Sequence, residues 1–250
     1  MPDAIILAGE GEEQENITKF GVGNRALLVI QEQFMVEYVI EALKAVSSIE
    51  RIVVVGPVKE FKTRIGALVE DVVPPGYTPF ESTLNGLKRL QTQENVLVLT
   101  SDIPLVKGEM IEDFLFRCEK TRADFYYPIV RKEVYQKKFS RTKRTFVCLK
   151  EGCFSGGNLF LINPSVVERR KDWIMRVIRT RKSPLAIARL LGIVVILKYL
   201  LKRLSVKNIE KRVENILGMK GLAIITPYPE MGFDVDLPEH VDLAKRFLKN

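Results

Sequence analysis

The stretch Ala4-Ile5-Ile6-Leu7-Ala8, followed at once by Gly9-Glu10-Gly11, decides the fold class of this chain. An apolar run of this length is typical of a strand buried on both faces of a sheet. A glycine directly after such a strand lets backbone N–H groups approach a phosphate closely, because no Cβ stands in the way. The chain therefore opens like the first strand and phosphate-binding loop of an α/β domain. The same opening also occurs in α/β proteins that bind nothing there.

Further apolar runs alternate with helical patterns along the chain. Strands are expected at 51–55, 96–100, 159–162 and 222–226, and helices at 35–43, 82–90, 109–118 and 238–248. Residues 123–148 are expected to form longer β segments, and residues 165–217 a basic helical insertion or subdomain. Strands separated by helices predict one Rossmann-related α/β domain over residues 1–250, with a mostly parallel sheet covered on both faces.

Composition excludes several kinds of chemistry. The chain has 250 residues, enough for one large domain, and its single histidine, His240, argues against Ser-His-Asp hydrolases and histidine-rich metal sites. Cys118, Cys148 and Cys153 are odd in number and lack CxxC spacing, so we expect reduced thiols in a cytoplasmic protein. The first residues lack the basic and long apolar regions of a signal peptide, so none is expected.

The net charge of +8 is concentrated in two clusters, within residues 131–144 and 169–182. Such clusters favour polyanions, and nucleotide phosphates or a phosphorylated acceptor are the first candidates. The alternative is a solvated basic face without a ligand. Nucleic acid is an unlikely partner, because no aromatic-rich RNA-binding motif or Cys/His finger accompanies the clusters.

The segment Leu190–Leu201 is strongly apolar but contains Lys198 and covers only a dozen residues. A membrane span needs about 20 apolar residues. We therefore expect a buried strand or helix of the subdomain, and attachment to a membrane surface is the less favoured alternative.

Carboxylates follow two of the apolar runs. Asp102 comes just after the strand expected at 96–100, where an α/β sheet collects its ligands, and it can hold Mg²⁺ on a nucleotide or cap a helix. Asp234 and Asp236 alternate in a segment expected to be extended, and we expect them to point to opposite faces, so that only one of them joins Asp102. We assign Asp234 to the metal and Asp236 to the cap of the helix that begins at Pro238.

Six motifs of the chain together resemble those of a known family. The motifs are AIILAGEG (4–11), NRALLVIQEQFMVEYVIEAL (24–43), ESTLNGLKRL (81–90), VLVLTSDIPLV (96–106), GGNLFLINP (156–164) and DVDLPEHVDLA (234–244). Their order is similar to that of MobA-like NTP transferases, which belong to the GT-A-like nucleotidyltransferases. The resemblance covers roughly residues 4–120, 145–165 and 220–248, and it lies in the order and spacing of the motifs rather than in any one of them.

The resemblance implies an Mg²⁺-dependent nucleotidyltransferase whose partners are an NTP and an anionic small-molecule acceptor. It implies that Ala8, Gly9 and Gly11 surround the triphosphate and that Ser82 and Gly86 lie beside the base. It also implies that Arg25 and Asp102 are catalytic and that Asp102 and Asp234 hold the metal. Asn158 would face the acceptor.

Two departures from the family pattern keep other functions open. Glu10 stands where the family usually has a second glycine, and Arg25 stands where it usually has a lysine. A nucleotide-binding or scaffold protein that has lost turnover is the first alternative. A GT-A glycosyltransferase is the second, although Ser101-Asp102-Ile103-Pro104 lacks the DxD motif of those enzymes. The sequence does not indicate the base, the acceptor or the oligomeric state.

Overall fold

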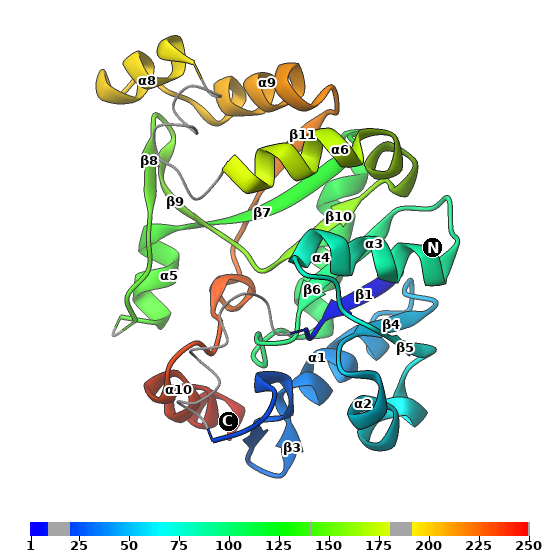
Figure 1. Cartoon of the computed structure of the whole chain (residues 1–250). Helices are drawn as coiled ribbons and strands as arrows, with labels where there is room; N and C mark the ends of the chain where they lie inside the picture. The colour runs from blue at the N-terminus through cyan, green and yellow to red at the C-terminus, as the bar shows by residue number, and fades with distance from the viewer. Residues whose placement is uncertain (10–20, 141, 181–191, 250) are drawn as a thin grey trace.

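A computed structural model describes residues 1–9, 21–140, 142–180 and 192–249 of the chain (Figure 1). Within them, a sheet of nine strands comprises β1 (Asp3–Leu7), β4 (Ile52–Val55), β5 (Asp71–Val73), β6 (Val96–Thr100), β7 (Phe125–Arg131), β8 (Val147–Leu149), β9 (Gly152–Gly156), β10 (Leu159–Ile162) and β11 (Gly221–Thr226). A separate hairpin consists of β2 (Val29–Ile30) and β3 (Gln33–Phe34).

The helices connect these strands. They are α1 (Met35–Lys44), α2 (Val58–Ile65), α3 (Pro79–Leu90), α4 (Gly108–Glu119), α5 (Lys132–Lys138), α6 (Pro164–Thr180), α8 (Ile193–Leu200), α9 (Val206–Leu217) and α10 (Pro238–Leu248), with short 3₁₀ turns η2 (Arg25–Leu27), η3 (Gly66–Leu68) and η4 (Pro229–Gly232). Helices α6, α8 and α9 lie in the stretch for which helices were expected, and α8 and α9 lie together at one end of the molecule (Figure 1).

The sheet is mixed and mostly parallel. β5, β4, β1 and β6 are parallel neighbours in that order. β10 then runs antiparallel between β6 and β7, while β11 joins the other edge of β7 in parallel. The predicted Rossmann-related α/β fold is therefore confirmed.

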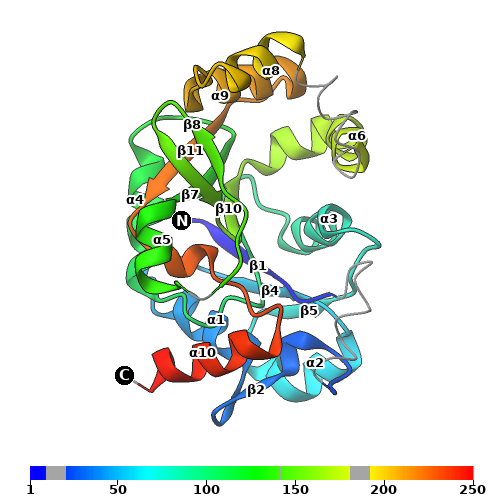
Figure 2. The same cartoon turned by 90° about the vertical axis from the view of Figure 1, so that its left-hand side faces the viewer.

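Alternating residues of the strands face two apolar layers. Ala4 and Ile6 of β1 belong to the core under α1 and α4, whereas Ile5 belongs to the core under α3 and α6. These three side chains are fully buried. Figure 2 shows the two helix layers on opposite sides of the sheet. Burial on both faces explains why β1 is apolar at every central position.

A third apolar cluster packs residues 233–236, called here the C-terminal segment, over the carboxyl ends of the strands. The rings of Phe233 and Phe139 stack with centroids 4.5 Å apart, and Val235 and Phe233 are fully buried. Because alternate residues of this segment point inward, Asp234 and Asp236 are left for the polar side. The cluster therefore carries these two carboxylates to the edge of the sheet where β6 ends.

The region 123–148 differs from its predicted all-β form. β7 ends at Arg131, and α5 follows directly over Lys132–Lys138. Tyr135 is the buried residue of α5, where it packs against Phe139 and Phe146. A seven-residue helix with one strongly buried position has no helical periodicity that a sequence pattern can reveal.

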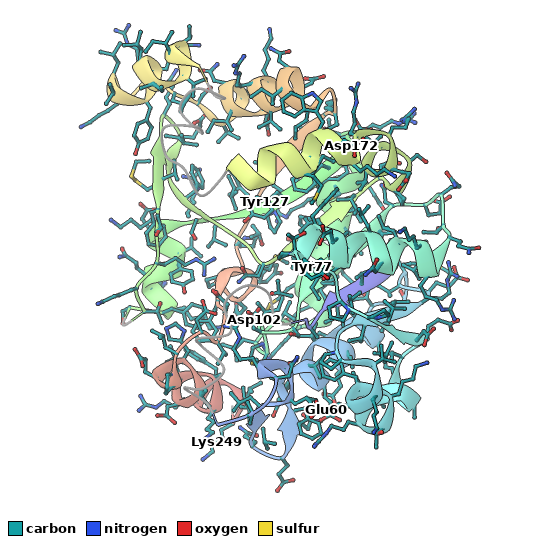
Figure 3. All side chains as sticks on the ribbon, in the orientation of Figure 1. Glu60, Tyr77, Asp102, Tyr127, Asp172 and Lys249 are labelled. Atoms are coloured by element: carbon teal, nitrogen blue, oxygen red, sulfur yellow. A yellow bond between two sulfur atoms is a disulfide. The ribbon has the colours of Figure 1, made fainter. Side chains whose placement is uncertain are left out.

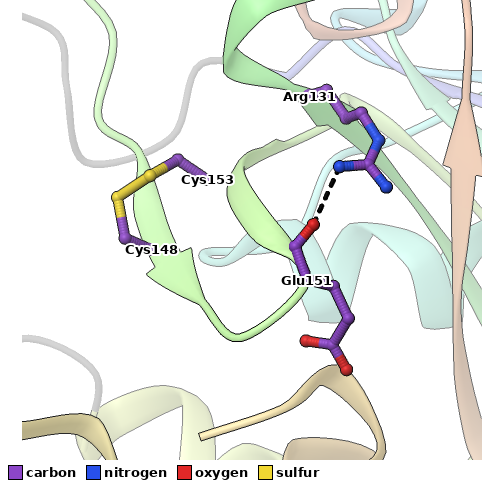
Figure 4. Close-up of a disulfide and its surroundings, with 4 residues drawn as sticks. All are labelled: Arg131, Cys148, Glu151 and Cys153. Atoms are coloured by element: carbon purple, nitrogen blue, oxygen red, sulfur yellow. Dashed lines mark hydrogen bonds between the residues drawn. A yellow bond between two sulfur atoms is a disulfide. The ribbon is translucent and has the colours of Figure 1, made fainter. Parts of the chain in front are cut away.

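The prediction of three reduced thiols is wrong for two of them. Cys148 on β8 and Cys153 on β9 form a disulfide (Figure 4). They are opposite each other in the antiparallel register of this hairpin, where side chains of paired residues lie close together. Cys118 is free and buried, and burial raises the pKa of its thiol to about 12. The expected cytoplasmic location relied partly on reduced thiols, and it stays a prediction.

The apolar segment Leu190–Leu201 does not form the buried element that we expected. Its described part is α8 and the adjoining residues, of which only Val195 is buried. Among the described residues, no helix combines the length and apolar character needed to cross a bilayer.

Gly86 is the point of closest approach between α3 and β1. A Cβ at this position would lie 2.8 Å from Cδ1 of Ile5, which is fully buried. We expect Gly86→Ala to lower the free energy of unfolding by about 1–2 kcal/mol, because overpacking costs more than the roughly 1 kcal/mol of helix propensity that alanine adds. Urea unfolding measures the change.

Gly66→Ala is the matched control, since its Cβ would meet only Lys62 Cβ at 3.7 Å, an ordinary contact. That variant should be as stable as the wild type or slightly more stable. Adding Ile5→Val removes the atom nearest to the new methyl group, so it should offset part of the overpacking in Gly86→Ala. Unchanged stability of Gly86→Ala would contradict the close contact.

Candidate functional site

The carboxyl ends of β1 and β6 leave the sheet side by side. The two strands are parallel, with Leu7 paired to Thr100, and the N–H of Ser101 donates to the carbonyl of Leu7 at 3.0 Å. The segments Ala8–Gly9 and Ser101–Asp102 therefore start at the same edge, where open α/β sheets bind their ligands. Asp102 lies in the central part of the molecule (Figure 3).

Arg25 joins this edge through its neighbour Asn24. The buried Asn24 side chain donates from Nδ2 to the carbonyl of Ala8 at 2.9 Å and accepts from the N–H of Ala26 at 2.8 Å. Arg25 is the first residue of η2, and its Nη2 lies 3.2 Å from Oδ2 of Asp102. Its Nη1 donates to Oδ1 of Asp236. The guanidinium thus links the end of β6 to the C-terminal segment.

Asp234 has a different cationic partner. Nη1 of Arg144 lies 2.5 Å from Oδ1 of Asp234, and the same guanidinium donates to Ser155 Oγ and to the carbonyl of Gly156. The N–H of Val235 donates to the carbonyl of Asp102 at 2.9 Å, which fixes the two acidic segments against each other. The expectation that Asp234 and Asp236 point to opposite faces is wrong. Residues two apart in an extended segment lie on the same face, and the two carboxyl groups are hydrogen-bonded to each other while each also contacts its own arginine.

The expectation that Asp236 caps the final helix is wrong. The N-cap residue of α10 is Leu237, and no side chain caps it. Asp236 pairs with Arg25 instead, because the backbone between 234 and 236 is extended and turns its carboxylate toward the end of β6. Pro238 is nevertheless the first residue of the helix, as expected.

The cluster holds three carboxylates and two guanidinium groups. Burial raises the pKa of Asp102 above its usual range, against the opposing charge of Arg25. Burial, with the hydrogen bond and charge of Asp234, raises the pKa of Asp236 to about 7. Burial would also raise the pKa of Asp234, but its hydrogen bonds to Asp236 and Arg144 outweigh it and lower that pKa. Asp234 is therefore the member best held in its ionised form at neutral pH.

Arg25 stays charged in this setting. Burial alone would lower the pKa of its guanidinium, but the charges of Asp102 and Asp236 outweigh burial and raise it. The side chain of Arg25 keeps 25% of its surface exposed, so it is accessible to a ligand at the edge of the sheet. A permanently charged, partly accessible fork suits a phosphate.

The residues present fit a magnesium ion. Oδ1 of Asp102 is buried and has no hydrogen-bond partner among the described residues, so one carboxylate oxygen at the end of β6 is unused. In the described ranges, no group of three His, Cys, Asp or Glu side chains is arranged to hold a metal by itself. Mg²⁺ on a nucleotide needs only one or two carboxylates, because phosphate oxygens and water supply the rest.

Of the predicted triphosphate and base residues, Gly9 and Ser82 lie near the start of α3, whereas Gly86 lies in the middle of this helix. A Cβ on Gly9 would lie 2.7 Å from Cβ of Pro75 and 3.9 Å from Ser82 Oγ, so this backbone passes close to the segment before α3. Ser82 accepts from the N–H of Gly76 at 3.0 Å. Gly86 faces Ile5 in the core. Their nucleotide-binding roles stay predictions, and Gly11 lies outside the described residues.

Asn158 lies beside Asp234 and at the end of β6. Its backbone N–H donates to the carbonyl of Met231 at 2.7 Å, and its carbonyl accepts from the N–H of Thr100 at 3.0 Å. Its side chain helps to lower the pKa of Asp234. Asn158 therefore shares the site with the acidic cluster, and its role toward an acceptor stays a prediction.

Sequence reasoning missed three contributors: Asn24, Arg144 and Ser155. Asn24 could have been noticed as a polar residue directly before Arg25, ahead of the apolar run that begins at Ala26. Arg144 was counted only as one of many basic residues, and no local pattern distinguishes it from its neighbours. Its hydrogen bonds to Asp234 and Ser155 span 90 and 11 residues, and only the folded sheet creates them.

A cavity of about 470 Å³ lies next to the site but does not include it. Its lining comes from α1, from the start of α4 and the residues before it, from the ends of α5 and α10, and from Tyr228 and Glu230, with Lys107 and Lys138 among its polar residues. Lys138 and Glu230 form an ion pair with each other. Because Arg25, Asp102 and Asp234 do not line it, we do not treat this cavity as the nucleotide site.

A mixed sheet of this order, with helices on both faces, is the Rossmann-like, GT-A-type fold of nucleotidyltransferases. The family model for the MobA-like NTP transferase domain matches residues 4–190, and the chain belongs to this family. The resemblance inferred from the sequence motifs is therefore confirmed. Among curated protein sequences, none matches the chain.

Solved structures support the same placement. A hypothetical transferase from Thermus thermophilus is 39% identical, with a TM-score of 0.85 over 96% of this chain and 99% of that one. The 4-diphosphocytidyl-2C-methyl-D-erythritol synthase from Anaerococcus prevotii is 14% identical, with a TM-score of 0.62 over 100% and 96% of the two chains. CMP:2-keto-3-deoxy-manno-octonic acid synthetase complexed with CTP is 11% identical, with a TM-score of 0.64 over 100% and 99%. At these low identities, the last two share the fold alone.

Proposed function

We propose that the protein is an Mg²⁺-dependent nucleotidyltransferase that moves an NMP from an NTP to an anionic small-molecule acceptor and releases pyrophosphate. The observation that carries the proposal is the Arg25–Asp102 pair at the joined ends of β1 and β6. It supports the proposal because it sets a guanidinium, which suits a phosphate, beside a carboxylate with an unused oxygen at the edge where open α/β sheets bind their ligands.

The proposed reaction is an in-line displacement at the α-phosphorus. An acceptor oxygen forms the new P–O bond, the bond to the bridging oxygen of the β-phosphate breaks, and pyrophosphate leaves with its electron pair. An acceptor phosphate is already ionised at neutral pH, so no side chain needs to take up a proton. This fits the single histidine, His240, whose Nδ1 lies 2.9 Å from the carbonyl oxygen of Asp234 and is therefore occupied by backbone.

The residues of the cluster then act mainly by position and charge. Asp102, with Asp234 as the second candidate ligand, would hold Mg²⁺, which would neutralise charge on the phosphates when bound. Arg25 is shared between Asp102 and Asp236, and neutralising these carboxylates would release its guanidinium to the donor phosphates. Asn158, Ser155 and Arg144 border Asp234 and mark the side for the acceptor.

The first experiment is thermal unfolding of the full chain with ATP, GTP, CTP and UTP, each with and without MgCl₂. CTP is tried first, because two proteins of the same fold carry cytidine nucleotides in their names. A ligand at 100 times its dissociation constant adds about 2.7 kcal/mol, which raises Tm by roughly 5–10 °C at this size. For the nucleotide that binds, pyrophosphate release is then measured with phosphorylated acceptors.

The outcomes separate the three functions. A Mg²⁺-dependent rise in Tm with one nucleotide, followed by pyrophosphate release, supports the transferase. Tight binding without pyrophosphate release for any acceptor supports a nucleotide-binding or scaffold protein. Release of sugar from a UDP- or GDP-sugar supports the glycosyltransferase. No rise in Tm with any nucleotide would refute the proposal.

A further inference from the structure

The most exposed apolar surface of the described chain is α8 with its adjoining residues. Twelve large apolar side chains are exposed in the described part of the chain, and six of them lie within residues 193–201. They are Ile193, Val194, Leu197, Tyr199, Leu200 and Leu201, with exposed fractions from 46% to 69%. A cluster of this kind on one short element is a sign of an interaction surface rather than of scattered surface residues.

The spacing of these residues forms one face. Ile193, Leu197, Leu200 and Leu201 are separated by four, three and one positions, which places them along one side of a helix. The other side is attached to the protein. Val195 is buried there, and Nζ of Lys198 donates to Oδ1 of Asn208 on α9 at 3.3 Å.

The turn after α8 is also fixed. The N–H of Arg203 donates to the carbonyl of Lys198 at 2.7 Å, and the N–H of Lys150 donates to the carbonyl of Leu204 at 2.8 Å. The apolar face is therefore presented on an anchored element. In Figure 1, α8 lies at the end of the molecule opposite α10.

The charge around this face is mostly positive, although the carboxylate of Glu151 accepts from the N–H of Val206 just beyond it. The sequence from Trp173 to Ile209 contains nine Lys and Arg residues and no Asp or Glu. Among them, Lys202, Arg203 and Lys207 are exposed next to the apolar face. An aliphatic face bordered mainly by cations is the pattern of a helix that lies in the interface of an anionic bilayer.

We propose that residues 193–203 dock the protein on an anionic lipid surface, with Leu197, Leu200 and Leu201 in the boundary between headgroups and acyl chains. A second copy of this chain fits less well, because it would bring two cationic surfaces together. The phosphates of a nucleic acid would pair with the cations, but the aliphatic side chains would stay exposed to water. A bilayer satisfies both features, and α8 lies on its surface, since the segment is too short to cross.

The test is flotation of the full chain with vesicles of phosphatidylcholine alone, or with about three-tenths phosphatidylglycerol, at low and at about 0.5 M salt. We expect binding to the anionic vesicles only, weakened by salt. Leu200→Asp should reduce that binding about ten-fold or more, because it removes apolar contact and adds a like charge to the lipid. Leu200 is 69% exposed, so the variant should fold normally.

Phe116→Asp is the matched control. Phe116 is an apolar residue of α4 that is 61% exposed, so this variant makes the same kind of change on a different element. It should bind anionic vesicles like the wild type. Absence of vesicle binding, equal binding to neutral vesicles, or full binding by Leu200→Asp would each overturn the proposal. A dimer that Leu200→Asp converts to a monomer, without lipid binding, would overturn it in favour of a second copy.

Discussion

Replacing Asp102 with Asn is expected to remove the Mg²⁺-dependent part of nucleotide binding and to lower turnover by a factor of about a thousand or more. Asp102 supplies a buried carboxylate oxygen without a hydrogen-bond partner at the joined ends of β1 and β6. An amide at this position keeps the shape of the side chain but loses the charge that a divalent cation needs. The rise in Tm with nucleotide and MgCl₂ measures binding, and pyrophosphate release measures turnover.

The same change should leave the fold intact. Burial raises the pKa of Asp102, which means that its ionised form is held at a cost in the folded state. Removing that charge therefore offsets much of the loss of the contact with Arg25, and Asp236 continues to pair with Arg25. Tm without ligand should change by only a few degrees.

Asp113→Asn provides the control for Asp102→Asn. Asp113 forms an ion pair with Arg117 on the surface of α4, away from the cluster, so its loss should affect neither stability nor nucleotide binding appreciably. A Mg²⁺-dependent rise in Tm that survives in Asp102→Asn would show that Asp102 does not hold the metal.

The strands and the approximate site could be predicted because both depend on local pattern. β1 and β6 are apolar at every central position, and each is followed at once by residues that leave the sheet. Parallel strands place such residues at one edge, so the neighbourhood of Ala8 and Asp102 follows from the pattern. The alternation of Asp234 and Asp236, by contrast, was misinterpreted as placing them on opposite faces, whereas residues two apart in an extended segment share a face and these two are hydrogen-bonded to each other.

The pairing of charges could not be predicted in the same way. Arg25 contacts Asp236 across 211 residues, and Arg144 contacts Asp234 across 90. Which arginine meets which aspartate depends on how Phe233 and Val235 pack into their cluster, and that packing is a property of the whole fold. The cap assigned to Asp236 was wrong for this reason. A local rule predicted a helix cap, but a distant arginine holds the carboxylate.

The exposure of α8 was missed for a related reason. An apolar run of a dozen residues with one lysine is as typical of a buried helix as of an exposed one. What distinguishes the two is whether neighbouring elements cover it. Here Val195 is the buried residue of α8, and the absence of acidic residues from 173 to 209 becomes informative once the helix is known to be exposed.

Replacing Arg25 with Met is expected to lower both stability and nucleotide affinity. The guanidinium separates Asp102 from Asp236, and its loss leaves three neighbouring carboxylates with Arg144 as the cation that remains in the cluster. Removing one partner of a largely buried pair should cost about 2–4 kcal/mol, or roughly 5–10 °C in Tm. Nucleotide affinity should fall about a hundred-fold, since a charged fork toward phosphate is lost. Urea unfolding and nucleotide titration measure the two effects.

Companion variants separate charge from general instability. Arg51→Met removes the partner of the buried Asp3 at the start of β1, so it should lower stability without affecting nucleotide affinity. Arg25→Lys keeps the charge but cannot bridge two carboxylates, so it should lie between the wild type and Arg25→Met. Adding Asp102→Asn to Arg25→Met removes one of the repelling carboxylates and should restore part of the lost stability, which makes the pair non-additive. If Arg25→Met is as stable as the wild type, or if the double variant shows strictly additive losses, Arg25 does not organise this acidic cluster.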